Sequence, residues 1–328
     1  MKTSMLEIKA ADKIVRTCAT VRAGETVVIV TDPTLFDVAD KIAAAAYTAQ
    51  ADPVIAVMPP REWDGQEPST AVAAAMRAAD VVIFPTVKDI AHSVAMKEAL
   101  QAGARAISMA GCGEDILRDP ALEADFVAQR PICDRAADVL TRATTIRVTN
   151  PAGTDVTFSV QDRKGNAHAC IVDRPGAFSG TPNIEANIAP VEGTAEGVIV
   201  FDASIPNLRT GILRDPVRLT VERGAVTRIE GGRDAKNLER LWAAQHDPNV
   251  YNIAQFAMGL NPLCQEADGG LVHDHGLYGS VHFGIGTSSN LGGVVKATGH
   301  IDGIMYDPTV TVDDVTILSH RTYTLDRV

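Results

Sequence analysis

The sequence predicts an α/β fold combined with an α+β region. We expect an N-terminal doubly wound parallel-sheet domain, followed by a mainly antiparallel β domain with a few helices. The N-terminal part alternates apolar strand-like runs with helical segments, the pattern of a parallel sheet. From Thr145 the residues alternate with a period of two around a Pro-Ala-Gly turn, which indicates an antiparallel hairpin. At 328 residues the chain also exceeds the roughly 250–300 residues at which a single core stops growing. We therefore predict one domain over residues 1–144 and a second over residues 145–328.

The elements of the first domain follow in regular order. A helix over residues 5–21 has apolar side chains on one side, and a continuous apolar strand follows at Thr26–Val30. Uninterrupted apolar strands are typical of parallel sheets covered on both faces. The remaining predicted elements are helix 36–48, strand 52–58, helix 69–79, strand 80–86, helix 92–102, strand 104–109 and helix 133–143. Neither GxGxxG nor GxxxxGKS/T follows the first strand, so the sequence gives no support to a nucleotide site.

The second domain is predicted from short period-two runs. The hairpin that begins at Thr145 is followed by a loop rich in Gly, Pro and Asn at Phe178–Pro190. Further strands are expected at residues 198–201, 218–221 and 226–230, and a helix at 237–245. We find no internal repeat and no low-complexity linker.

Composition excludes several classes of protein. The net charge of −11 argues against nucleic acid and anionic membranes as partners. The first residues lack the apolar segment of a signal peptide, and no apolar run approaches the ~18 residues that a membrane span requires. The five cysteines are scattered without a CxxC pair, which argues against a disulfide framework or a zinc ribbon. We expect a cytoplasmic protein that acts on a small molecule.

The stretch from Tyr278 to Asp307 carries the strongest chemical pattern. It contains His282, a glycine-rich segment, and then His300 and Asp302 two residues apart on a strand-like run. Residues two apart on a strand point to the same face, about 6 to 7 Å apart. Imidazoles and a carboxylate that converge from glycine-bent strands are typical ligands of a divalent metal. The alternative is a solvated strand face without a ligand.

Other polar residues are candidates for the same site. Glu185 lies between apolar residues of the 178–190 loop, and Gln255 lies between small and apolar residues, a poor place for an unpaired amide. His92 and Ser93 follow the third strand, at the edge where ligands bind to doubly wound sheets, although a helix-surface histidine is the alternative.

Two further patterns argue for or against particular chemistries. His273 and His275 share a face if the LVHDH segment is extended, which indicates a weaker second metal site. No GxSxG motif is present, and no cysteine stands in a catalytic signature, so metal chemistry is favoured over a nucleophilic serine or cysteine.

Several segments, taken in order, resemble the aminopeptidase T family of metallopeptidases. They are AGETVVIVTD at the first strand, Glu185 ahead of AEGVIVFD, AQFAMGLNP, the HFGIG segment that begins at His282, and the final His300-Ile-Asp302. The resemblance covers nearly the whole chain. It extends to a relative with the same fold, 2,5-dihydroxypyridine 5,6-dioxygenase, a mononuclear non-haem iron enzyme. The segments similar to that relative are His92-Ser93, DPNVYNIAQFAMGL and LGG ahead of HID.

Departures from the two relatives change what the resemblance implies. Gln255 stands where the peptidases have a metal-binding glutamate and the dioxygenase a metal-binding histidine. Leu277 stands where the peptidases have a further glutamate, and Ser289 stands where they have the catalytic tyrosine. The resemblance therefore implies one divalent ion, Zn, Mn or Fe, with the ligands His282, His300, Asp302 and Glu185. It also implies a homodimer.

The first hypothesis is a metal-dependent hydrolase that cleaves an amide or cyclic amide C–N bond of a small molecule with metal-activated water. Glu185 would be a ligand or the general base, and His92 would orient substrate. Gln255, Ser93 and Ser289 would contact substrate or support the ligands. The first alternative is a two-histidine, one-carboxylate Fe²⁺ site in a ring-cleaving dioxygenase of a hydroxylated pyridine-type heterocycle. The second alternative is a metal-free binding protein that has kept the fold.

Overall fold

The computed structural model describes residues 3–289 and 291–327. Within these residues, contacts divide the chain into two compact units. The first unit comprises residues 1–130, 168–184 and 271–273, and the second comprises 131–167, 185–270 and 274–328. The boundary predicted near residue 145 stays a prediction. The predicted fold class is confirmed, because a parallel sheet in the first unit is combined with antiparallel sheets.

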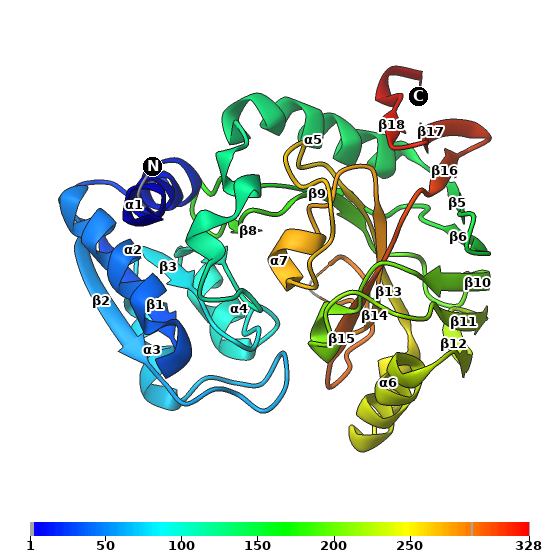
Figure 1. The fold of residues 1–328 in the computed structure, drawn as a ribbon, viewed down its shortest axis with the longest axis horizontal. Coiled ribbons are helices and arrows are strands. Elements are labelled where there is room, and N and C mark those ends of the chain that lie inside the picture. Colours follow the sequence, from blue (N-terminus) through cyan, green and yellow to red (C-terminus); the bar gives the residue numbers. More distant parts are fainter. Residues whose placement is uncertain (1–2, 290, 328) are drawn as a thin grey trace. The chain divides into compact units, whose positions relative to one another are not determined.

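The first unit is built on a parallel sheet with the strand order β2-β1-β3-β4-β8 (Figure 1). The strands are β1 (Thr26–Thr31), β2 (Asp52–Val57), β3 (Val81–Phe84), β4 (Arg105–Ser108) and β8 (Phe178–Gly180). The helices are α1 (Thr3–Lys13), α2 (Phe36–Thr48), α3 (Thr70–Ala78) and α4 (Val94–Gln101). Every residue of β3 and β4 is buried, as expected for central strands between helices.

An antiparallel sheet of the second unit, sheet B, has the strand order β12-β11-β10-β6-β5-β16-β17-β18. Its strands are β5 (Thr145–Thr149), β6 (Asp155–Ser159), β10 (Glu196–Phe201), β11 (Val217–Glu222), β12 (Ala225–Glu230), β16 (Thr309–Val312), β17 (Val315–Ser319) and β18 (Thr322–Tyr323). The predicted hairpin is β5 paired with β6, and its buried residues alternate as the period-two pattern requires.

A further sheet, sheet C, has the strand order β15-β14-β13-β9-β7. Its strands are β7 (Asn166–Ala169), β9 (Ile184–Ile188), β13 (Ile253–Gly259), β14 (Val281–Gly286) and β15 (His300–Met305). Helices α5 (Phe126–Arg142) and α6 (Arg233–Ala244) complete the longer elements of this half of the sequence. Phe256 and Phe283 lie next to Phe158, with ring centroids 5.5 to 5.8 Å apart, and form an apolar core against the sheet.

The segment predicted as a loop at 178–190 is different in the structure. It contains β8 and β9, and every residue of β9 is buried. Strand β9 pairs with β13, so its Gly- and Asn-containing sequence is held extended by a neighbour that lies far away in the chain. Glu185 is therefore a residue of an inner strand of sheet C, in a much more rigid position than a loop would provide.

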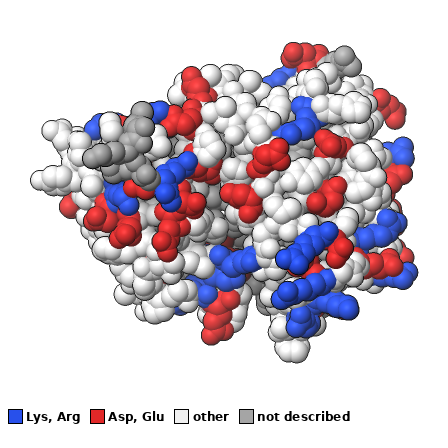
Figure 2. Space-filling view, in the orientation of Figure 1, with Lys and Arg blue, Asp and Glu red and all other residues white. Residues whose placement is uncertain are grey.

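The surface carries both signs of charge. Figure 2 shows acidic and basic side chains interspersed over the face in view, with basic groups gathered near α6, which contains Arg233, Lys236 and Arg240. Over residues 3–289 and 291–327, no helix combines the length and apolar character needed to cross a membrane.

Candidate metal centre

Sheet C carries a group of polar side chains on one face, which we call the polar cluster. It consists of residues on β9, β13, β14 and β15 and of one residue directly after the short helix α7 (Leu271–Asp274): Glu185, Gln255, His275, His282, His300 and Asp302. The His275 side chain is 15% exposed, and the others are more deeply buried. Buried ionisable groups are costly unless they are paired or bind a metal, so this cluster is a functional-site candidate.

A glycine leaves the space in which the cluster forms. In the sheet register, Gly284 stands between Gln255 on β13 and Asp302 on β15. A Cβ atom on Gly284 would lie 2.2 Å from Nε2 of His300 and 2.9 Å from Cβ of Gln255. Only glycine at this position lets side chains from the neighbouring strands meet over the sheet.

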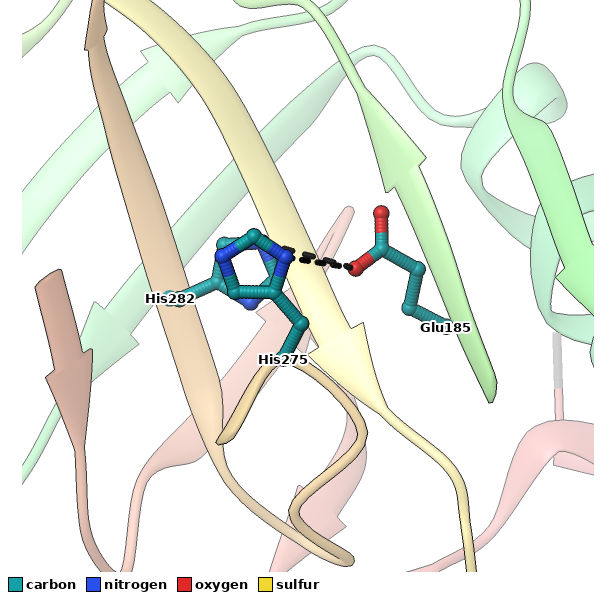
Figure 3. A group of neighbouring side chains, drawn as sticks. All are labelled: Glu185, His275 and His282. Carbon is teal, nitrogen blue, oxygen red and sulfur yellow. Dashed lines mark ion pairs between the residues drawn. The ribbon is translucent and has the colours of Figure 1, made fainter. Parts of the chain in front are cut away.

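Glu185, His275 and His282 lie together, with both rings facing the carboxylate (Figure 3). Nε2 of His282 lies 3.6 Å from Oε2 of Glu185, and Nδ1 of His275 lies 4.0 Å from the same oxygen. One ligand atom from each residue lies within 4.8 Å of the other two. Metal–ligand bonds of about 2.0–2.2 Å place neighbouring ligand atoms roughly 3 Å or more apart, so small side-chain movements suffice to bind one ion.

His282 has the protonation state of a metal ligand. Burial, and then the charge of His275, lower the pKa of His282 to about 4, so the ring is neutral at pH 7. Nε2 of Gln255 lies 3.4 Å from Nε2 of His282. Among the described residues, Nδ1 of His282 has no hydrogen-bond partner. Nε2 is thus the ring nitrogen of His282 that faces the cluster, on the Glu185 side of the site.

Both ring nitrogens of His300 are within hydrogen-bond distance of oxygen atoms. Nδ1 donates to the carbonyl oxygen of Thr287 at 2.8 Å, and Nε2 lies 3.1 Å from both Oε1 of Gln255 and Oδ1 of Asp302. Burial alone would lower the pKa of His300, but the charge and hydrogen bonds of its partners raise it above the ordinary value. The same ion pairing holds the pKa of Asp302 well below its usual range despite burial. In this arrangement both ring nitrogens of His300 face oxygen atoms, which favours the charged form of the ring.

His275 lies between two carboxylates. Its Nε2 is 3.4 Å from Oδ2 of Asp302, while its Nδ1 faces Glu185. Burial opposes the charged form of His275, but Asp302 and then Glu185 raise its pKa to about 9. Its ion pair with Asp302 favours the charged form. A metal ion that binds His275 would therefore replace one of its protons.

Comparisons with known proteins place this chain in a family. The family model described as 2,5-dihydroxypyridine 5,6-dioxygenase matches residues 8–323. The chain belongs to the 2,5-dihydroxypyridine 5,6-dioxygenase family. A curated family relative of the same name, from Pseudomonas putida, is 26% identical over 253 residues, which cover 74% of this chain and 71% of the relative.

Solved structures show the same fold. A 2,5-dihydroxypyridine dioxygenase structure from Pseudomonas putida matches with a TM-score of 0.83 at 20% identity, over 99% of this chain and 98% of that chain. Wild-type AmpT from Thermus thermophilus matches with a TM-score of 0.74 at 14% identity, over 98% of this chain and 99% of that one. The resemblance to aminopeptidase T thus holds for the fold.

The dioxygenase family corrects the first functional hypothesis. The prediction of a hydrolase that cleaves a C–N bond is wrong, because the family match over residues 8–323 is to 2,5-dihydroxypyridine 5,6-dioxygenase. The prediction of an enzyme is confirmed, and the family is that of the first alternative. The hydrolase was favoured because Glu185 and His282 match the peptidases, but shared residues on a shared fold do not determine the reaction.

The polar cluster contains residues that fit a divalent metal ion. Two imidazoles and one carboxylate that converge with open positions are the ligand type of non-haem Fe(II) oxygenases. Glu185, His275 and His282 supply this set, and Nε2 of His282 faces the Glu185 carboxylate.

The structure brings together the predicted residues of the second unit. Glu185, His282, His300 and Asp302 all lie in the polar cluster, and the amide of Gln255 lies between the ends of the cluster, within 3.4 Å of Glu185, His282 and His300. Their assignment as ligands stays a prediction.

The remaining predicted residues lie elsewhere. His92 belongs to the first unit, where its Nε2 is 3.7 Å from Oδ2 of Asp89. Ser93 caps α4: its Oγ accepts from Met96 N at 3.1 Å. Ser289 is exposed, and its Oγ lies 3.5 Å from Oγ1 of Thr287. Their proposed functional roles stay predictions, as do the homodimer and the cytoplasmic location.

His275 is the cluster residue that the predicted ligand set lacked. His273 and His275 would share a face only if the LVHDH segment were extended, but residues 271–274 form a helical turn. Nδ1 of His273 instead pairs with Oδ2 of Asp119 at 2.6 Å. The only signal for His275 in the sequence was its spacing of two residues from His273.

Proposed function

We propose that this chain is a metal-dependent dioxygenase that opens the ring of a hydroxylated pyridine-type heterocycle. The observation that carries the proposal is the buried group of Glu185, His275 and His282, two imidazoles and one carboxylate within 4.8 Å. The family relative that acts on 2,5-dihydroxypyridine supports the substrate class and a small-molecule partner.

The proposed ligands are Glu185, His275 and His282. When bound, Fe²⁺ supplies the redox chemistry by which O₂ reacts with an organic ring. The neutral state of His282 suits it to bind the ion without first losing a proton. His275 must release one proton on binding.

The rest of the polar cluster is proposed to bind and orient the substrate. Gln255 and His300 are buried, and their N–H groups donate to neighbours within the cluster. A ring hydroxyl or its oxyanion would bind there by replacing one of these acceptors, at a buried position where hydrogen bonds are stronger than in water. Asp302 favours the charged form of His300. These residues would thus hold the substrate oxygen beside the metal.

A second ligand set deserves a direct comparison, because the sequence predicts it. This set is Glu185, His282, His300 and Asp302, and Asp302 lies close enough to His275 to be within reach of the same ion. Both sets share Glu185 and His282. They differ in whether His275 or the pair of His300 and Asp302 completes the ligands, which single substitutions distinguish.

Oxygen uptake tests the proposed function. Protein purified without air, loaded with Fe²⁺ and mixed with 2,5-dihydroxypyridine should consume O₂ and lose the aromatic absorbance of the ring. Pyridine without hydroxyl groups should give no uptake. The matched control is His282→Ala protein treated in the same way. Iron-loaded wild type without oxygen uptake on any dihydroxylated pyridine would contradict the proposal.

A further inference from the structure

The two carboxylate oxygens of Glu185 have different surroundings. Oε1 accepts a hydrogen bond from Nδ2 of Asn187 at 2.6 Å and another from Nε2 of Gln255 at 3.3 Å. Oε2 instead faces the ring nitrogens of His275 and His282. One oxygen is thus occupied by amide donors, while the other is directed at the proposed metal position.

The amide of Asn187 is itself oriented by Asn166. Nδ2 of Asn166 donates to Oδ1 of Asn187 at 3.0 Å and to the carbonyl oxygen of Leu291 at 3.3 Å. Because Oδ1 of Asn187 accepts this bond, its Nδ2 must point to Glu185. Asn187 is 1% exposed, so water does not compete for its amide. The two asparagines form a directional chain that ends at Oε1 of Glu185.

We infer that Asn187, oriented by Asn166, is a positioning residue that makes Glu185 a one-oxygen metal ligand. This inference rests on the proposed function, because it assigns Glu185 to the metal. Outer hydrogen bonds of this kind fix ligand orientation, and their loss typically weakens metal affinity about 10- to 100-fold. Neither asparagine belongs to the ligand set that the sequence predicts, and both act through Glu185.

Isosteric substitutions test the direction of each hydrogen bond. Asn187→Asp removes the donor and places an acceptor against Oε1 of Glu185. Asn166→Asp places an acceptor against Oδ1 of Asn187, so the Asn187 amide should turn over and present Oδ1 to Glu185. Titration of metal-free protein with Co²⁺ should show affinity about 10- to 100-fold lower for Asn187→Asp and lower in the same direction for Asn166→Asp. The visible absorption bands of bound Co²⁺ should also change, because they report ligand geometry and do not depend on catalysis.

Asn150→Asp is the matched control. Oδ1 of Asn150 accepts from Thr154 N at 2.8 Å in the β5–β6 turn, a bond that aspartate keeps. This variant should bind Co²⁺ with wild-type affinity and spectrum.

Several results would overturn the inference. Wild-type affinity and spectrum in Asn187→Asp would do so, and so would a wild type that binds no Co²⁺. If Asn187→Asp does not fold, as judged by circular dichroism, unchanged binding in Asn166→Asp would overturn it. The oxygen-uptake assay is separate. Suppose that the wild type binds Co²⁺ and that the substitutions lower its affinity, while the iron form consumes no O₂. That combination would refute the proposed function and leave the positioning role standing.

Discussion

The rings of His275 and His282 stack face to face, with centroids 4.4 Å apart and planes inclined by 16°. The two rings differ in charge. Burial opposes the charged form of both, but Asp302 and Glu185 raise the pKa of His275 to about 9, whereas burial and the charge of His275 lower that of His282 to about 4. A protonated ring against a neutral one avoids the repulsion of two stacked cations. The pair thus supplies one imidazole that is ready to bind metal and one that must first lose a proton.

Substitution of single histidines should distinguish the two ligand sets. His282→Ala should abolish stoichiometric iron binding, because both sets contain this residue. His275→Ala should weaken Fe²⁺ or Co²⁺ binding by more than about 100-fold, since loss of a ligand should exceed loss of an outer contact. His300→Ala should keep metal affinity within about tenfold while it lowers turnover. Metal analysis and titration measure each effect.

His246→Asn serves as the control for these histidine substitutions. His246 is exposed and has a positive φ of 51°, a conformation that asparagine tolerates. Strong loss of metal in His300→Ala, together with near-normal binding in His275→Ala, would establish the set predicted from the sequence in place of the one proposed from the geometry.

Gly284→Ala should displace the His300 side chain from the polar cluster. The added Cβ would meet Nε2 of His300 at 2.2 Å, so His300 must move away from Gln255 and Asp302. We expect a loss of about 1–3 kcal/mol in the free energy of unfolding, measured in urea, and a larger relative loss of oxygen uptake. Gly180→Ala is the control, since its nearest neighbour would lie 3.5 Å from the new Cβ. Wild-type oxygen uptake in Gly284→Ala would argue against the cluster as the reaction site.

Binding of a divalent ion should stabilise the fold. A ligand that binds only the native state at 100 times its Kd contributes about 2.7 kcal/mol, which corresponds to roughly 4 °C in Tm for a chain of this size. Thermal unfolding of metal-free protein with added Co²⁺ should show this increase, and Glu185→Gln should reduce it. An unchanged Tm in wild type at saturating Co²⁺ would contradict a metal centre in the polar cluster.

The ion pair of Glu25 and Arg105 should make stability depend on pH. Nη1 and Nη2 of Arg105 donate to the two carboxylate oxygens of Glu25 at 3.0 and 2.7 Å. Burial raises the pKa of Glu25, but bonds from Arg105 and the Arg22 backbone outweigh it, so the pKa lies below its ordinary value. This stabilisation is present above the ordinary glutamate pKa of about 4.3 and is lost as pH falls through the lowered folded-state pKa.

Glu25→Gln tests this pH dependence. At neutral pH the variant should be less stable than wild type by about 2 kcal/mol in urea unfolding, because Arg105 loses a charged partner. The difference should shrink as the pH is lowered to about 3. A difference that stays constant with pH would show that the charge of Glu25 does not stabilise the fold.

Sequence reasoning reached much of the fold because the signals are local. Continuous apolar runs such as Thr26–Val30 indicate parallel strands, and the alternation after Thr145 indicates an antiparallel hairpin. Glu185 was expected in a loop because Gly, Pro and Asn surround it, but β9 is held extended by pairing with β13. Local propensity cannot report a partner strand about 70 residues away, which is why this strand was missed.

The sequence by itself determined the residue types of the site, including the His300–Asp302 spacing that places both side chains on one face of a strand. Only the tertiary structure decided which groups meet there. It brought His275 from the turn after α7 against His282, and it turned the amide of Asn187 toward Glu185. The physical reason is that a metal site depends on distances of a few ångströms between side chains from different strands, and strand register and packing set these distances.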